Sequence, residues 1–139
     1  MGEGFRTFDH TGDLGLEVWA ETPRRLYALA AEALLAQIVE AGLGAPEVQV
    51  EIELEGEDPR DLLVHWLNSA LLESELKRAV WIRAEVTSLS PRALSGSLSG
   101  PRRDPRRQVF LREVKAVSHH FLELELEPTG CRCRLILDI

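Results

Sequence analysis

Two short acidic segments, one near each end of the 139-residue chain, carry the residue types best suited to chemistry. The first is DHTGD at residues 9–13, in a predicted turn after a short strand, and the second is LDI at residues 137–139, where an acid closes an apolar strand. If the first and last strands are neighbours, their carboxylates gather at one sheet edge. Such oxygen ligands suit a hard cation such as calcium or magnesium. The segments therefore predict a metal site, with solvated acids at a turn and at a frayed terminus as the alternative.

Histidine and lysine side chains are weaker candidates for a functional site. His119 and His120 adjoin a predicted strand, so their rings face opposite sides and only one can belong to a given site. Lys115 alternates with apolar neighbours, which predicts that it projects from a solvated sheet face with Glu113. His65 lies beside the apolar stripe of a predicted helix, which favours a partly buried structural side chain. The sequence contains no glycine-rich phosphate loop, GxSxG elbow or HExxH helix.

The charge balance argues against non-specific binding of nucleic acid. The chain has 16 Lys and Arg residues against 23 Asp and Glu residues, a formal net charge of −7, and such a protein repels phosphates. The one basic island is an arginine-rich loop, Arg102 to Arg107. It could hold RNA phosphates, a nucleotide or an acidic partner surface. We favour a solvated loop whose arginines balance nearby glutamates.

Two amphipathic helices are predicted. Thr22 caps the first, whose apolar residues recur at helical spacing to about Ala41, where Gly42 and Gly44 end it. Asp58 caps the second, which has Pro59 in its first turn and carries a stripe of leucine, tryptophan and alanine.

Strands account for most of the remaining chain. Alternating apolar and polar residues predict strands at 14–20 and 48–54, and the pattern after residue 79 is all strand. Two amphipathic helices need a sheet to cover, so the predicted class is α+β: a two-layer sandwich with both helices on one face of a large mixed or antiparallel β-sheet.

The length favours a single domain over residues 1–139. No apolar run approaches membrane-spanning length, so we expect a cytoplasmic protein with no membrane partner.

Four segments, taken in order, resemble the archease family. They are DHTGDLGLEVWAETPRRLYALAAEAL at residues 9–34, DLLVHWLN at 61–68, EVKAVSHH at 113–120 and LILDI at 135–139. The first resembles the opening strand, turn and helix of the family, and the second resembles its second-helix signature. The third resembles its EVKAVTYH segment, and the fourth resembles its C-terminal run of three apolar residues followed by Asp and then Val or Ile. No single segment is decisive, but the four together are highly specific.

This resemblance implies a small cytoplasmic protein that assists the GTP-dependent RNA ligase of tRNA splicing and RNA repair. That ligase joins a 3′-phosphate or 2′,3′-cyclic phosphate end to a 5′-hydroxyl end, after guanylylating its own active-site histidine with manganese. Archease-like proteins are cofactor proteins that speed this activation and restore multiple turnover, and they are not enzymes themselves. The tRNA or RNA ends would be reached indirectly, through the ligase.

The resemblance also carries site residues onto this chain. The metal site falls on Asp13, Asp138 and Ile139, the last through its main-chain or terminal oxygens. All-oxygen ligands favour calcium, with magnesium or manganese as alternatives. Further family positions near the same edge, which would contact the ligase or a nucleotide, are Asp9, His10, Lys115 and His120.

The chain departs from the family pattern at three places. Gly12 stands where the family usually has Ala, His119 stands where it has Tyr, and residues 100–103 replace an acidic-aromatic stretch. A ligase contact through that last segment would therefore be charged differently. Two other function classes stay open: a chaperone-like binding module, and a stand-alone metal-dependent hydrolase. The hydrolase would use the three acids of the two segments around a catalytic ion, with His10 or His120 as general base.

Overall fold

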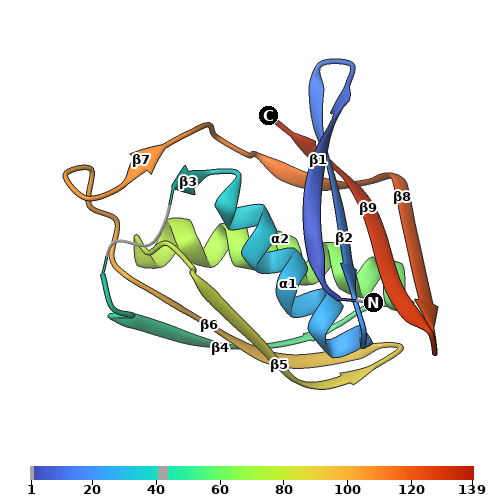
Figure 1. The fold of residues 1–139 in the computed structure, drawn as a ribbon. Coiled ribbons are helices and arrows are strands. Elements are labelled where there is room, and N and C mark those ends of the chain that lie inside the picture. The colour runs from blue at the N-terminus through green and yellow to red at the C-terminus, as the bar shows by residue number, and fades with distance from the viewer. Residues whose placement is uncertain (1, 41–43) are drawn as a thin grey trace.

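The computed structural model describes residues 2–40 and 44–139, and it confirms the predicted α+β class (Figure 1). Two helices, α1 (Pro23–Ala36) and α2 (Pro59–Lys77), interrupt a chain made mostly of strands. The strands, in chain order, are β1 (Gly4–His10), β2 (Asp13–Ala20), β3 (Val39–Glu40), β4 (Val48–Glu55), β5 (Arg83–Ser90), β6 (Ala93–Gly100), β7 (Val109–Phe110), β8 (Ala116–Glu127) and β9 (Gly130–Asp138).

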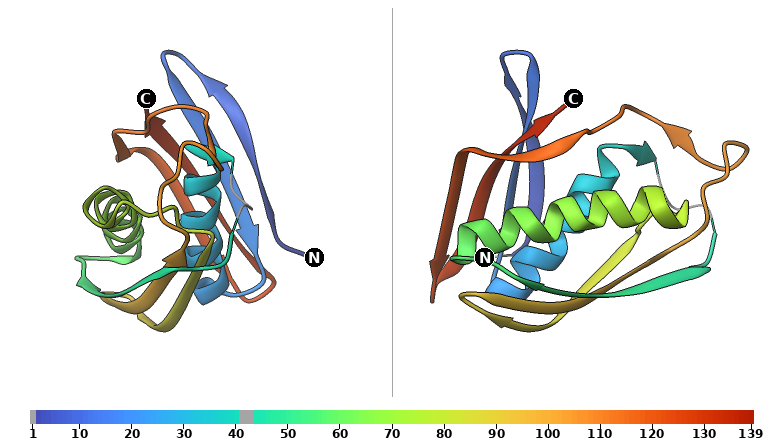
Figure 2. Two further views of the ribbon diagram at one scale, coloured as in Figure 1. Left: turned by 90° about the vertical axis from the view of Figure 1, so that its left-hand side faces the viewer. Right: turned by 180° about the vertical axis from the view of Figure 1, so that it is seen from behind.

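The strands form three antiparallel sheets, whereas the sequence predicted one large sheet. A four-stranded sheet has the order β1-β2-β9-β8, a three-stranded sheet has the order β4-β6-β5, and β3 pairs with β7. Helix α1 contacts β2 and β5, and α2 contacts β8 and β4, so each helix touches both larger sheets. Both helices accordingly lie in the angle between these two sheets (Figures 1 and 2).

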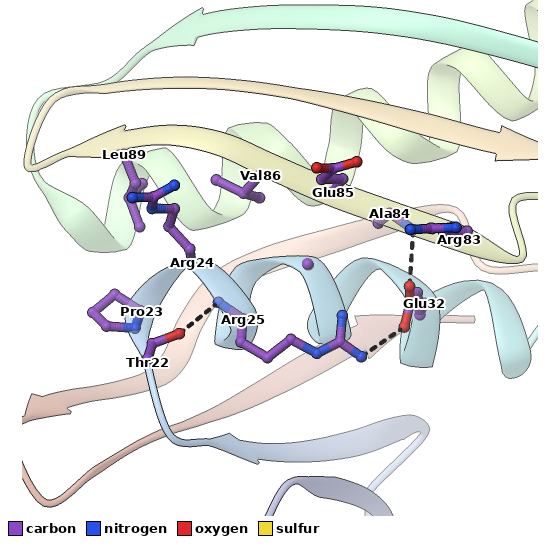
Figure 3. A pocket seen from close by; sticks show the side chains of 11 residues that line it. Thr22, Pro23, Arg24, Arg25, Glu32, Arg83, Ala84, Glu85, Val86 and Leu89 are labelled. Atoms are coloured by element: carbon purple, nitrogen blue, oxygen red, sulfur yellow. Dashed lines mark hydrogen bonds and ion pairs between the residues drawn. The ribbon is translucent and has the colours of Figure 1, made fainter.

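Contacts from α1 cover part of the free edge of β5. Side chains of α1 occupy backbone groups that a further strand would use: the Ala84 amide donates to Glu32 Oε2 at 2.8 Å. Arg24 Nη1 donates to the Thr87 carbonyl at 3.2 Å. Figure 3 shows Glu32 reaching from the helix to this edge, with Arg25 bonded to its other oxygen. An edge strand covered in this way cannot pair with a neighbouring sheet.

Helix α1 is shorter than the sequence predicts. It begins as expected, with Thr22 Oγ1 accepting the Arg25 amide at 3.2 Å. It ends at Ala36 because the next residues pair with β7, where Val39 lies opposite Phe110. Tertiary pairing of this segment thus outweighs its helical periodicity. The predicted positions 41 and 42 lie outside the described residues.

Large side chains fill the core where the helices meet the sheets. Trp66 and Trp81 are almost fully buried, and their indole N–H groups donate to the Tyr27 and Ala70 carbonyls at 2.8 and 3.0 Å. The two cysteines, at positions 131 and 133, are free and buried, as the sequence predicts. Neither described helix is both long and apolar enough to cross a membrane.

Candidate functional site

The pairing of β2 with its two neighbours brings the acidic segments of the chain together. Leu14 on β2 lies opposite Leu137 on β9, so continuing the register by one residue places Asp13 opposite Asp138. On the other side of β2, His10 pairs directly with Asp13. The two segments thus meet at one end of the four-stranded sheet, near the tip of the β1–β2 hairpin (Figure 1).

Asp13, Asp138 and His10 share one face of this sheet. Leu14 and Leu137 pack on the core, so their neighbours in each strand point to the face away from the helices. Residues directly opposite on adjacent strands have Cβ atoms about 4.5–5.5 Å apart. Two carboxylates at such a separation can reach one cation.

The side chains of Asp13 and His10 at this end of the sheet are partly exposed to solvent, but one ring nitrogen of His10 is buried. Asp13 and His10 are 33% and 32% exposed, and their Oδ2 and Nδ1 atoms are 3.7 Å apart. The Nδ1 atom itself is buried and has no hydrogen-bond partner among the described residues. A buried ring nitrogen without a hydrogen-bond partner, 3.7 Å from a carboxylate oxygen, indicates a site that a further group would complete.

The donor set of this site fits a hard cation rather than a soft one. The described residues contain no group of three or more His, Cys, Asp and Glu side chains arranged to hold a metal ion. A cation here would take the carboxylates of Asp13 and Asp138, and the remaining ligands would be main-chain oxygens of Ile139 and water. Such a set suits calcium and also admits magnesium or manganese.

Lys115 touches the candidate site through its backbone. Its amide donates to the Asp138 carbonyl at 2.7 Å, and the register of β8 against β9 places it beside Ile139. Its side chain lines a groove of about 930 Å³ between α2 and the segment before β8. Exposed apolar residues also line that groove, namely Leu72, Phe110 and Leu111.

The other two residues matched to the family lie on different sides of this site. Asp9 pairs with Leu14, so it lies on the opposite face of β1 from His10. His120 lies in an irregular part of β8, between the pairs formed by residues 118 and 123, where its register against β9 shifts. This irregularity brings Phe121 within 5.4 Å of His10, measured between ring centroids. No sequence pattern indicates Phe121 as a site residue, because a shift in register leaves no pattern in a single sequence.

A second group of polar side chains lies where α2 meets β8. His119 Nε2 and His65 Nε2 are 3.1 and 3.4 Å from Asp61 Oδ1, and the Glu57 amide donates to the other oxygen at 2.8 Å. The Glu57 amide first, and then the hydrogen bond to His119, hold the pKa of Asp61 below its usual range. The side chain of His65 is 48% exposed and lies 3.0 Å from the Glu55 carbonyl, so this histidine has structural contacts at the surface.

The arginine-rich loop at residues 102–107 is held both by its own contacts and by contacts with α2 and the residues that follow this helix. Buried Gln108 bonds to the amide of Asp104 and to the carbonyl of Arg102. Arg103 pairs with Glu75 at 3.2 Å, and Arg107 pairs with Asp104 at 3.6 Å. These pairs agree with the interpretation that the arginines balance nearby acids.

Comparisons with known proteins give one consistent result. A model of the archease protein family matches residues 5–139. The chain is 34% identical to protein archease of Methanopyrus kandleri over 134 residues, which cover 94% of this chain and 96% of that protein. It is 32% identical to protein archease of Archaeoglobus fulgidus, covering 97% and 98% of the two chains.

Solved structures agree with this fold. The solution structure of protein 1598 of Methanobacterium thermoautotrophicum matches with a TM-score of 0.80 at 24% identity, covering 98% of this chain and 99% of the other. The crystal structure of an archease from Thermotoga maritima, described as a possible chaperone, matches with a TM-score of 0.66 at 19% identity, covering 96% of each chain.

Proposed function

This chain belongs to the archease family, and we propose that it is a metal-binding accessory protein that activates a GTP-dependent RNA ligase. In this proposal it promotes guanylylation of the ligase and restores multiple turnover, and it meets tRNA or RNA ends only through that partner. The observation that supports the proposal is that Asp13 and Asp138 each come one residue beyond the last pair of β2 with β9, Leu14 with Leu137, at an exposed end of the sheet.

The chemistry of the site supports this role. A divalent cation bound there would supply positive charge and open coordination positions for phosphate oxygens. The chain's own contribution is to orient two carboxylates from neighbouring strands and to hold His10 beside them. Because the site lies at the end of a sheet and not in a deep cleft, a partner enzyme can approach it directly.

The test is a guanylylation assay with the purified ligase, GTP and a divalent cation. Asp13→Asn and Asp138→Asn should each abolish stimulation while leaving the fold intact. Glu125→Gln is the matched control, because Glu125 is an exposed carboxylate at the other end of the same sheet, paired with Arg132. Full stimulation by both Asn variants would refute the proposal. Activity on GTP or RNA ends without the ligase would instead support a metal-dependent hydrolase.

The groove beside α2 favours a second candidate, a chaperone-like binding module. Its exposed apolar residues Leu72, Phe110 and Leu111 could bind a protein segment without any cation. Variants separate the two candidates, whereas chelation would also remove the manganese that the ligase itself is expected to use. Stimulation that survives in Asp13→Asn and Asp138→Asn but is lost in Leu72→Ser would favour the binding module, and the reverse pattern would favour the metal-dependent activator.

A further inference from the structure

Phe121 is an exposed aromatic residue in a strained backbone conformation. Its φ is 57°, in the left-handed region, and the residue is 62% exposed. Bulky L residues seldom adopt this region, and where they do, they concentrate at functional sites. Burial of the side chain does not compensate for the strain here, because most of the residue faces solvent.

Two imidazole rings flank Phe121 without covering it. The ring centroids of His120 and His10 lie 4.1 and 5.4 Å from that of Phe121, at interplanar angles of 55° and 57°. Tilted neighbours contact a ring without lying flat on it, so a flat group can still stack on Phe121. His10 connects this aromatic group to the candidate cation site, because it also lies beside Asp13.

We propose that Phe121 is a stacking platform for the base of a nucleotide whose phosphate lies at the Asp13–Asp138 site. This inference rests on the proposed function, since it needs a cation at that site. Aromatic side chains stack on any base, because every base has a π-face. Imidazole nitrogens can donate or accept hydrogen bonds to the same ligand. The two carboxylates would repel phosphate unless a divalent cation lay between them, so binding should require the cation.

The surroundings of Phe121 fit a nucleotide better than a protein segment. Protein-binding hot spots lie in well-packed apolar pockets. The aromatic rings that contact Phe121 are those of His10 and His120, and Asp13 lies 3.7 Å from His10. The base could belong to GTP or to an RNA end, since both combine a base with phosphate.

The isolated protein can test this inference. We would titrate ¹⁵N-labelled protein with GTP, with inorganic tripolyphosphate and with a short 3′-phosphorylated oligoribonucleotide, each with calcium and with EGTA. We expect at least one of the two base-containing ligands to bind roughly five- to a hundredfold more tightly than tripolyphosphate, only with calcium, and to shift the amide resonances of residues 119–122. Which of them binds identifies the source of the base. Equal binding of all three ligands, no binding, or binding in EGTA would overturn the inference.

Two variants make the test specific. Phe121→Gly suits a φ of 57° and so keeps the fold, but it removes the ring; it should lose the preference over tripolyphosphate. Phe121→Tyr keeps the ring and should keep the preference. An unchanged preference in Phe121→Gly would overturn the inference. If the wild type activates the ligase but shows no such preference, only this inference fails. If it does not activate the ligase at all, the proposed function fails, whatever the titrations show.

Discussion

Asp13→Asn should be more stable than the wild type without a cation and less stable than the wild type with one. Like charges directly opposite on neighbouring strands destabilise a sheet, on the scale of roughly 0.2–1 kcal/mol that cross-strand pairs contribute, and Asp13 and Asp138 each come one residue beyond the last pair of β2 with β9. In EGTA, Asp13→Asn should therefore raise the free energy of unfolding by about 0.5 kcal/mol, the middle of that range. Urea titration followed by circular dichroism would measure this change.

Calcium should make the wild type more stable than Asp13→Asn. At a calcium concentration of about 100 times Kd, binding to the native state adds about 2.7 kcal/mol to the free energy of unfolding of the wild type. The chain has 139 residues, and with an unfolding entropy of about 2.1 cal/mol/K per residue this is a rise in Tm of about 9 °C. Asp13→Asn should show little of that rise, while Glu125→Gln should show all of it. A calcium-dependent rise in Asp13→Asn equal to that of the wild type would refute the reasoning.

Three further predictions follow from individual contacts. Hydrogen bonds from the Glu57 amide and to His119 lower the pKa of Asp61. The contribution of Asp61 to stability is therefore present above its unfolded-state pKa and is lost as the pH falls through the lower native value. Asp61→Asn should flatten the plot of unfolding free energy against pH below about pH 4. Burial raises the pKa of Cys133 to about 12, so its thiol should resist iodoacetamide at pH 8 in the native state and react only in denaturant. Glu32→Ala leaves the Ala84 amide without its side-chain acceptor and should cost roughly 1–3 kcal/mol of unfolding free energy in urea titrations.

The sequence was informative wherever local chemistry decides the structure. Thr22 and Asp58 cap the helices they were predicted to cap, since a side-chain oxygen before a proline is a local signal. The alternation of apolar and polar residues in β2 predicted which of its side chains face the core. The prediction that the two acidic segments meet assumed that the first and last strands are neighbours, and this assumption is wrong, because β2 lies between β1 and β9. The segments still approach each other, because the first one spans the turn between β1 and β2, and Leu14 of β2 pairs with Leu137 of β9.

Long-range contacts decide what the sequence could not show. Helix α1 ends at Ala36 because Val39 pairs with Phe110, which is distant in the chain. The strands divide into separate sheets, and Glu32 of α1 covers part of the edge of β5, a contact between residues 52 positions apart that no local pattern reports. The placement of Phe121 beside His10 depends on the irregular register of β8, and no periodicity in a single sequence reports such a shift.

The side chain of one buried acid bridges the three strands that form the candidate site. Glu17 on β2 is 7% exposed, and its carboxylate lies within 2.8, 3.0 and 3.3 Å of Arg6 on β1 and of Arg132 and Arg134 on β9. These are the three strands whose ends carry the histidine and the two acids of the site. A site supported in this way can keep its geometry while one side stays open to solvent. The proposed accessory role would need that combination, because such a protein must present a preformed group to a partner enzyme rather than enclose a substrate of its own.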